Sequence, residues 1–329
     1  MMERKFHRVL LAFALALIGG PALVAKQPPP AKQLMERAHR LTDFRSKGSD
    51  PFQMTADFTL LDQGRDQQTG TYTLLWLSPE KWREEISLHD FTQVRILIGQ
   101  KLWRQRSGRV LPYAAYLLQS EFNALNLMKP LTSEKYSSVK TRNLNGKPAD
   151  CFKVRRGPRK GEELCFEPAS GVLLSIGSRQ NGTFFSHYEQ WGSNLVPQTI
   201  TTYSQGSASR VFEITDIESP RLPDSRAFTP PQGSVEMPGC QDPTSPRLLT
   251  KVRKREVELG NLRHHSGAFQ MLGEVGVDGT FHLLHVIHSP NKELDGPVLR
   301  AVSRMRYQPA SCNGTPVPVD VEIYYKPHD

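Results

Sequence analysis

Five histidines stand close together near the C-terminus of this 329-residue chain, and histidine is both a common metal ligand and a general base. They are His264, His265, His282, His285 and His288. Side chains alternate between the two faces of a strand, so His282 and His288 would share one face and His285 would lie on the other. Three ligands cannot converge from this strand alone, and we expect exposed histidines and no metal site.

Other catalytic patterns are incomplete. Gly177-Ser178 and Gly192-Ser193 lack the Gly-x-Ser-x-Gly frame of a hydrolase elbow, and the chain has no glycine-rich phosphate loop. Several acidic residues could furnish a catalytic pair, but no spacing fixes a distance between them: Asp62, Asp66, Glu84, Glu85, Asp90 and Glu121. We therefore expect a protein that is not an enzyme and that uses no cofactor.

Residues 1–25 have the layout of a secretory signal peptide. A basic start precedes an apolar run at residues 9–18, which is too short to span a bilayer comfortably. Cleavage near Ala25 would release the chain into the periplasm, and retention of the segment as an anchor is the alternative. No cysteine directly follows the apolar run, so lipid attachment there is not expected.

The chain is basic, with a formal net charge of +9 at pH 7. In an exported protein such an excess suits peripheral contact with an anionic membrane surface or cell-wall polymer better than nucleic acid. For the densest basic cluster, residues 251–255, a solvated helix face is the favoured interpretation.

Four cysteines in an exported chain are typical of disulfides, with three possible connectivities. The cysteines are Cys151, Cys165, Cys240 and Cys312. Cys151 and Cys165 lie in two strand-like runs on either side of a Gly/Pro turn, and a hairpin would bring them face to face. Cys240 and Cys312 are then left for each other.

Residues 52–103 alternate apolar and polar side chains, the period of strands with one apolar face. Turns at 63–70, 78–79 and 99–100 separate four or more strands, and strand signals resume over residues 150–217. About ten strands cannot stay flat, because twist accumulates across a sheet. The predicted fold class is α+β, with a strongly curved antiparallel sheet, or half-barrel, as its main part.

Two helices are predicted to lie on the concave side of that sheet. Residues 34–41 form an amphipathic pattern, and residues 113–128 form a second helix that ends at Lys129-Pro130. The residues expected to line an apolar cavity between sheet and helices are Met54, Phe58, Tyr72, Leu74, Trp76, Trp82, Ile96, Leu118 and Phe122. Buried methylenes at ~0.8 kcal/mol each would support micromolar binding of an acyl chain. The alternative is a sealed core against the helices.

Three segments are similar to the LolA family of periplasmic lipoprotein-sorting carriers. They are residues 70–79, which run from Gly-Thr-Tyr through Trp76 to Pro79, the Gly-Gln-Lys-Leu-Trp turn at 99–103, and Ala-Phe-Thr-Pro-Pro-Gln-Gly at 227–233. The resemblance implies a half-open barrel that shelters the acyl chains of a lipoprotein. Ser78 stands where that family has an arginine that latches the lid, so another lipid-like ligand fits equally well.

A small β-β-α-β domain is predicted to follow. Residues 269–277 and 281–287 flank an Asp278-Gly279 turn, residues 294–307 form a helix, and residues 317–325 alternate as a strand. A basic helix is expected before them, at residues 246–262. The predicted parts of the chain are a signal peptide at 1–25, the curved-sheet domain at 26–219, a Pro/Gly-rich linker that includes the first domain's closing strand segment at 220–245, and the small domain at 246–329.

The small domain resembles the TonB C-terminal domain. The similarity rests on Val277-Asp278-Gly279, on Met305-Arg306-Tyr307-Gln308-Pro309-Ala310 and on Asn313-Gly314-Thr315-Pro316-Val317. It implies that the last strand is an exposed edge to which an extended peptide from an outer-membrane protein adds. The edge residues would be Val319, Val321, Ile323 and Tyr325. The long spacer of an energy-transducing TonB is lacking here, so we expect a docking module.

The combined prediction is an exported, non-enzymatic envelope protein located in the periplasm. It would bind an acyl chain or a lipoprotein in the first domain and dock to an envelope protein through the second. The alternative is a protein–protein adaptor whose first domain has a filled core and no lipid ligand.

Overall fold

The computed structural model describes residues 30–61, 67–124, 135–155, 161–178, 180–220, 225–250 and 267–326, but not the side chains of residues 121–124 and 225. The first helix is α1 (Ala31–Thr42), and the strands β1 (Phe52–Leu60), β2 (Gln68–Ser78), β3 (Lys81–Leu88), β4 (Phe91–Ile98) and β5 (Lys101–Arg106) follow. After α2 (Tyr113–Ala124) come β6 (Lys135–Tyr136), β7 (Lys140–Leu144), β8 (Lys147–Arg155), β9 (Glu162–Phe166), β10 (Leu173–Gly177), β11 (Gly182–Trp191), β12 (Asn194–Ser204) and β13 (Ser207–Glu218).

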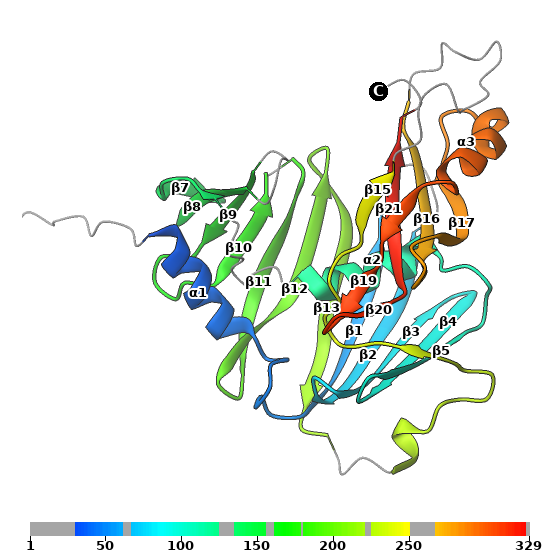
Figure 1. Cartoon of the computed structure of the whole chain (residues 1–329). Helices are drawn as coiled ribbons and strands as arrows, with labels where there is room; N and C mark the ends of the chain where they lie inside the picture. The colour runs from blue at the N-terminus through cyan, green and yellow to red at the C-terminus, as the bar shows by residue number, and fades with distance from the viewer. Residues whose placement is uncertain are drawn as a thin grey trace, which may run out of the picture.

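These strands form one large antiparallel sheet. Its 14 strands run in the order β14-β5-β4-β3-β2-β1-β13-β12-β11-β10-β9-β8-β6, with β7 paired to β8 and β14 spanning Val235–Pro238. Figure 1 shows that the sheet is strongly curved and stays open. The predicted curved antiparallel sheet is therefore confirmed, with more strands than the ten expected from the sequence.

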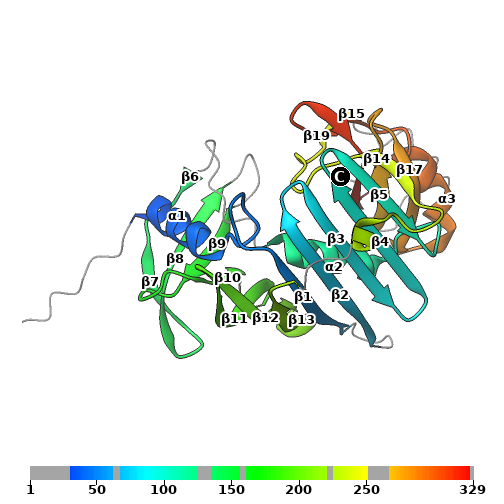
Figure 2. The same cartoon turned by 90° about the horizontal axis from the view of Figure 1, so that it is seen from below.

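Two helices share one core with this sheet. Leu34, Met35 and Ala38 of α1 and Leu118 of α2 are buried in the same apolar cluster as the inner side chains of the strands. Arg37 of α1 donates to the carbonyl of Ala169 across 2.8 Å, which fixes α1 over the half of the sheet that holds β9 to β12. Figure 2 shows α1 over that half and the C-terminal domain beside the half formed by β2 to β5.

The outer face of β3 and β4 is covered by the chain itself. Arg83 Nη1 donates to the carbonyl of Ala227 across 2.9 Å, and Ala227 lies in the 3₁₀-helix η2 (Ser225–Phe228). β14 then pairs with β5 and forms the edge strand at that end of the sheet. The segment predicted to be a linker therefore contributes both a cover and an edge strand to the first domain.

The small domain has a three-stranded sheet of order β17-β16-β21, formed by β16 (Phe269–Val275), β17 (Phe281–His288) and β21 (Val319–Tyr325). The 3₁₀-helix η5 (Lys292–Leu294) leads into α3 (Asp295–Val302), whose Val298 and Val302 pack on Phe269, Met271 and Ile323. Two ribbons complete it: β15 (Arg247–Thr250) with β18 (Arg306–Gln308), and β19 (Ala310–Cys312) with β20 (Thr315–Val317).

The small sheet domain agrees with the prediction, with two differences. The helix ends at Val302 and not at residue 307, because the chain turns there into β18. The basic helix expected at 246–262 is wrong at its start, where residues 247–250 form β15 and pair with β18. Residues 251–262 lie outside the described part of the chain.

Both predicted disulfides are present. Cys151 and Cys165 occupy directly opposed positions of β8 and β9, as a hairpin requires. The second disulfide joins Cys240, which follows β14, to Cys312 at the end of β19, and so ties the connecting segment to the small domain.

None of the helices described is long and apolar enough to cross a membrane. The predicted signal peptide, residues 1–25, lies outside the described residues.

Candidate ligand cavity and domain interface

A cavity of ≈ 1600 Å³ lies between the inner face of β2 to β5 and the small domain. Its floor, called here the cavity floor, is formed by Tyr72, Leu74, Trp76, Trp82, Glu84, Arg95 and Leu102. The opposite wall is residues 317–326, which include all of β21, and the rim is the connecting segment 237–246. The two sites predicted separately, a ligand cavity and an edge strand, thus border the same space.

Four of the predicted cavity residues line this space, namely Tyr72, Leu74, Trp76 and Trp82. All four are at most 6% exposed, and they belong to the same packed core as Met54, Phe58 and Leu118, which are at most 1% exposed and do not line the cavity. β1 lies near the middle of the sheet, and α2 with its neighbours fills the hollow there. Phe122 belongs to α2, but its side chain lies outside the described residues.

Ile96 departs from the prediction, because it lies on the other face of the sheet. It stands directly opposite Arg83, and Arg83 reaches the outer cover at Ala227. The inner face of β4 carries Gln93, Arg95 and Leu97 instead, opposite Ile86, Glu84 and Trp82.

An ion pair between Arg95, which is 23% exposed, and the buried Glu84 crosses the cavity floor, and sequence analysis did not predict it. Arg95 donates from Nε to Glu84 Oε1 at 2.7 Å and from Nη2 to Oε2 at 2.8 Å. Glu84 also accepts from the hydroxyl of Tyr72 at 3.0 Å and from Gln119 Nε2 at 3.3 Å. The alternation of β3 could have predicted that Glu84 lies on the inner face, since it shares a face with Trp82 and Ile86.

Burial shapes the charges of this cluster. Burial, reinforced by the adjacent Glu84, raises the pKa of Tyr72 well above its usual value, so the phenol stays neutral and donates. Burial opposes the charge on Arg95, but its contacts with Glu84 outweigh that effect and raise the pKa of Arg95. Glu84 and Arg95 therefore form a fixed, charge-balanced polar spot among apolar side chains.

Trp76 and Trp82 form the apolar end of the floor. They are directly opposed across β2 and β3. The indole N–H of Trp76 donates to Gln241 Oε1 at 2.9 Å, and Gln241 donates to the carbonyl of Arg45 at 2.9 Å, which anchors the rim. The buried indole N–H of Trp82 has no acceptor among the residues that the structure describes.

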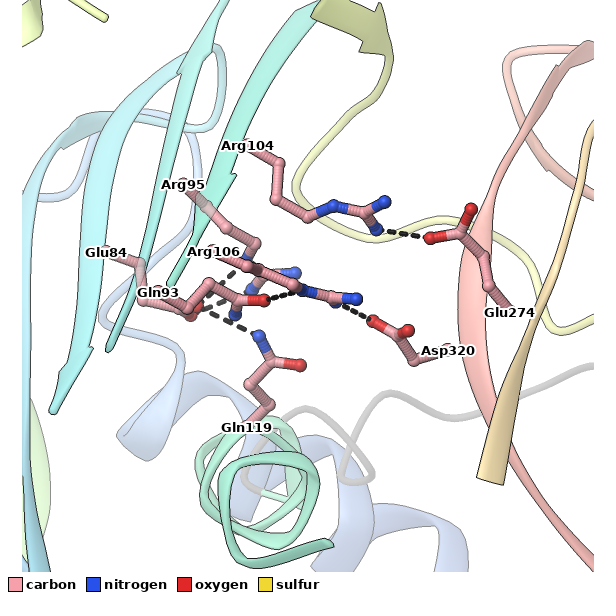
Figure 3. Close-up of polar contacts among 8 residues, drawn as sticks. All are labelled: Glu84, Gln93, Arg95, Arg104, Arg106, Gln119, Glu274 and Asp320. Carbon is pink, nitrogen blue, oxygen red and sulfur yellow. Dashed lines mark hydrogen bonds and ion pairs between the residues drawn. The ribbon is translucent and has the colours of Figure 1, made fainter. Parts of the chain in front are cut away.

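Figure 3 shows how ion pairs hold the small domain on β5. Arg104 bonds to Glu274 of β16, and Arg106 Nη2 donates to Asp320 Oδ2 of β21 at 2.7 Å. Arg106 Nε donates to Gln93 Oε1 at 2.5 Å. Burial lowers the pKa of Arg106, an effect that Asp320 opposes. Carboxylates of the small sheet thus meet guanidinium groups of the large one.

The same face of the small sheet also meets α2. The hydroxyl of Tyr113 donates to Glu322 Oε1 at 3.0 Å, and Gln270 Nε2 donates to that hydroxyl oxygen at 2.7 Å. Burial and then Glu322 raise the pKa of Tyr113, so it remains a neutral donor at ordinary pH. The contacts on β5 and α2 together set where β21 lies.

The predicted edge residues divide between two apolar clusters. Val321, Ile323 and Tyr325 pack in the small domain's core with α3, while Val319 packs with Cys312 and Val317. β21 pairs with β16 along one edge, and no other described strand pairs with it. β-Bulges place His282, His285 and His288 opposite Glu274, Leu272 and Gln270, so the prediction that His285 lies on the other face is wrong. The three form no metal-ligand group with other described residues, and His264 and His265 lie outside that part.

Residues 262–327 match the family model of the Gram-negative bacterial TonB protein C-terminal, which confirms the resemblance of the small domain. No curated protein matches the chain. LolA superfamily structures are among the solved structures that match the N-terminal part.

A LolA superfamily protein from Nitrosomonas europaea has 12% identity and a TM-score of 0.39, over 61% of this chain and 98% of that one. A putative outer membrane lipoprotein-sorting protein domain from Vibrio parahaemolyticus has 13% identity and a TM-score of 0.38, over 59% and 95%. A DUF1329 family protein from Desulfovibrio piger has 11% identity and a TM-score of 0.42, over 61% and 97%.

Proposed function

We propose that this chain is a non-enzymatic protein of the periplasm that holds an acyl chain or a lipidated partner in the cavity and docks to an envelope protein through its small domain. The observation that carries the proposal is the ≈ 1600 Å³ cavity over Tyr72, Leu74, Trp76 and Trp82. Pockets for small ligands typically measure roughly 300–1,000 Å³, so this one has room for a long chain.

The cavity floor suits an amphiphile. Trp76 and Trp82, which are 1% and 6% exposed, make one end of the floor apolar, and each ligand methylene removed from water contributes ~0.8 kcal/mol. About ten buried methylenes would supply roughly 8 kcal/mol, which corresponds to a micromolar dissociation constant. Glu84, Arg95 and Gln119 offer hydrogen bonds to a polar head group, and the Trp82 N–H offers a donor.

The docking role rests on the small domain, which matches the TonB C-terminal family, and on the edge strand β21. Strand addition would use the backbone of β21, whose residues include Val319, Val321, Ile323 and Tyr325.

A cavity-filling substitution tests the carrier function. Ser120 of α2 is half-buried and lines the cavity, so Ser120→Trp should fill the space without removing a core side chain. Ser87→Trp, at an exposed position of β3, is the matched control. Native mass spectrometry should find co-purifying lipid on the parent and on Ser87→Trp, and little on Ser120→Trp. Titration with 11-(dansylamino)undecanoic acid should likewise show binding to the parent and to Ser87→Trp, and much weaker binding to Ser120→Trp.

The second candidate function is a protein–protein adaptor without a lipid ligand. It is favoured by the packed state of Met54, Phe58 and Leu118, which closes part of the predicted hollow. A parent protein that carries no lipid and binds no dansyl fatty acid would support the adaptor and overturn the carrier. Binding that survives Ser120→Trp would place the ligand somewhere other than this cavity.

A further inference from the structure

The edge of β21, and not one of its faces, borders the cavity. Ten consecutive residues, 317–326, line it together with the cavity floor. Side chains of a strand alternate between its faces, so a space that touches every residue in succession lies beside the backbone. On the opposite edge β21 pairs with β16, and within the described chain no strand pairs with the edge that borders the cavity.

The ion pairs show which face of the small sheet packs on the large sheet. Glu274 of β16 reaches Arg104, and Asp320 of β21 reaches Arg106, so one face of the small sheet packs over β5 (Figure 3). A strand added at β21 would lie about 4.8 Å beyond it, in the space that residues 317–326 border. Packed sheets stand about 10 Å apart, and the side chains of the two sheets fill that distance. An added strand would therefore leave no room for an acyl chain between it and the large sheet.

We propose that a partner strand added at β21 and an acyl ligand occupy the same space, so that docking of the partner expels the ligand. This inference rests on the proposed function, since it requires an acyl ligand in the cavity. The occupant is an extended segment of a partner protein that pairs with the backbone of β21. Because linkage is reciprocal, a bound acyl chain weakens docking by the same factor.

The test supplies the strand by fusing it to this chain. A short Gly-Ser turn and seven alternating Thr and Val residues are appended after Asp329, close to the end of β21 at Tyr325. The tether gives the added strand an effective concentration in the millimolar range. The control carries the same extension with proline at every second position, which cannot form the ladder.

Hydrogen exchange of the β21 amides that do not bond to β16 reports whether the other edge has gained a strand, and this is what protection of β21 means below. Binding of 11-(dansylamino)undecanoic acid reports whether the cavity is open to a ligand. We expect protection of β21 and at least tenfold weaker binding of the dansyl fatty acid in the Thr/Val extension, with parental behaviour in the proline control. A protected β21 with undiminished binding would overturn the inference and leave the carrier function standing. An extension that does not protect β21 would show that the edge accepts no strand, which also overturns it. A parent that binds no dansyl fatty acid would remove the carrier function itself.

Discussion

Arg106 of β5 donates to Asp320 of β21 across 2.7 Å, although 214 positions separate the two residues. The two side chains are 7% and 13% exposed. Arg106 also donates from Nε to Gln93 Oε1, so the guanidinium is held on a second side. The arginine is therefore fixed in direction, and it fixes in turn where β21 runs beside the cavity floor.

Removal of Asp320 should leave Arg106 nearly buried without its counter-ion. We expect Asp320→Asn to lower the free energy of unfolding by about 3 kcal/mol, since a broken buried pair leaves an uncompensated charge. The double-mutant cycle with Arg106→Gln should give a coupling of about 1–3 kcal/mol in urea denaturation. The matched control is the exposed pair Lys101–Glu236, whose side chains are 63% and 48% exposed and whose coupling should stay below about 1 kcal/mol. Equal coupling in both cycles would contradict the structural role.

Tyr72 should make the protein less stable in alkali. Its pKa is raised by burial and by Glu84, so the folded chain keeps a proton that the unfolded chain releases near pH 10. The folded state then binds more protons, and stability that is fully present below pH 10 falls as the pH rises, by up to about 1.4 kcal/mol per pH unit. Tyr72→Phe should show a shallower decline between pH 9 and pH 11 in urea denaturation. An unchanged slope would mean that Tyr72 ionises as readily in the folded state.

Gly279 should tolerate no side chain. Its φ is +74°, and a Cβ there would overlap the carbonyl oxygen of Tyr307. We expect Gly279→Ala to lower stability by about 3 kcal/mol or more, because a clash adds to backbone strain. Gly314→Ala is the matched control in the same domain, with φ +86° and open space around it, and should cost only about 1 kcal/mol.

Hydrogen exchange of the β16 and β17 amides would report both glycine substitutions on the small domain itself. If the amides exchange at the same rates in the two variants, the close approach of Tyr307 to the Asp278-Gly279 turn does not contribute to stability.

The two disulfides should contribute differently to the free energy of unfolding. Cys240 and Cys312 are 72 positions apart, and Cys151 and Cys165 are 14 apart. The loop-entropy model then assigns about 4 kcal/mol to the first bond and about 3 kcal/mol to the second. Urea denaturation of the Cys240→Ser/Cys312→Ser and Cys151→Ser/Cys165→Ser variants would measure the order. The reverse order would show that strain or structure in the unfolded chain outweighs loop length.

Local features were predictable where a single pattern dominates. β1 begins at Phe52 and ends at Leu60, as the alternation indicates, because one of its faces is buried from Phe52 to Phe58. The disulfide between Cys151 and Cys165 followed from a hairpin that the turn residues specify.

Ile96 shows why other parts of the site could not be predicted from the sequence. Both faces of β4 are covered, the inner by the cavity side and the outer by η2, so apolar side chains do not mark one face. The roles of Arg104 and Arg106 depend on a domain more than 160 positions later in the chain. No local pattern distinguishes such arginines from solvated ones.

An open sheet must end somewhere, and the large sheet ends in small strands. β14 has four residues, the last of them Pro238, and at the opposite end β6 with two residues and β7 with five both pair with β8. Proline offers no backbone donor, and strands of two to five residues present only short ladders to a neighbour. Within the described chain, the wide sheet can therefore remain unclosed without recruiting further copies into filaments.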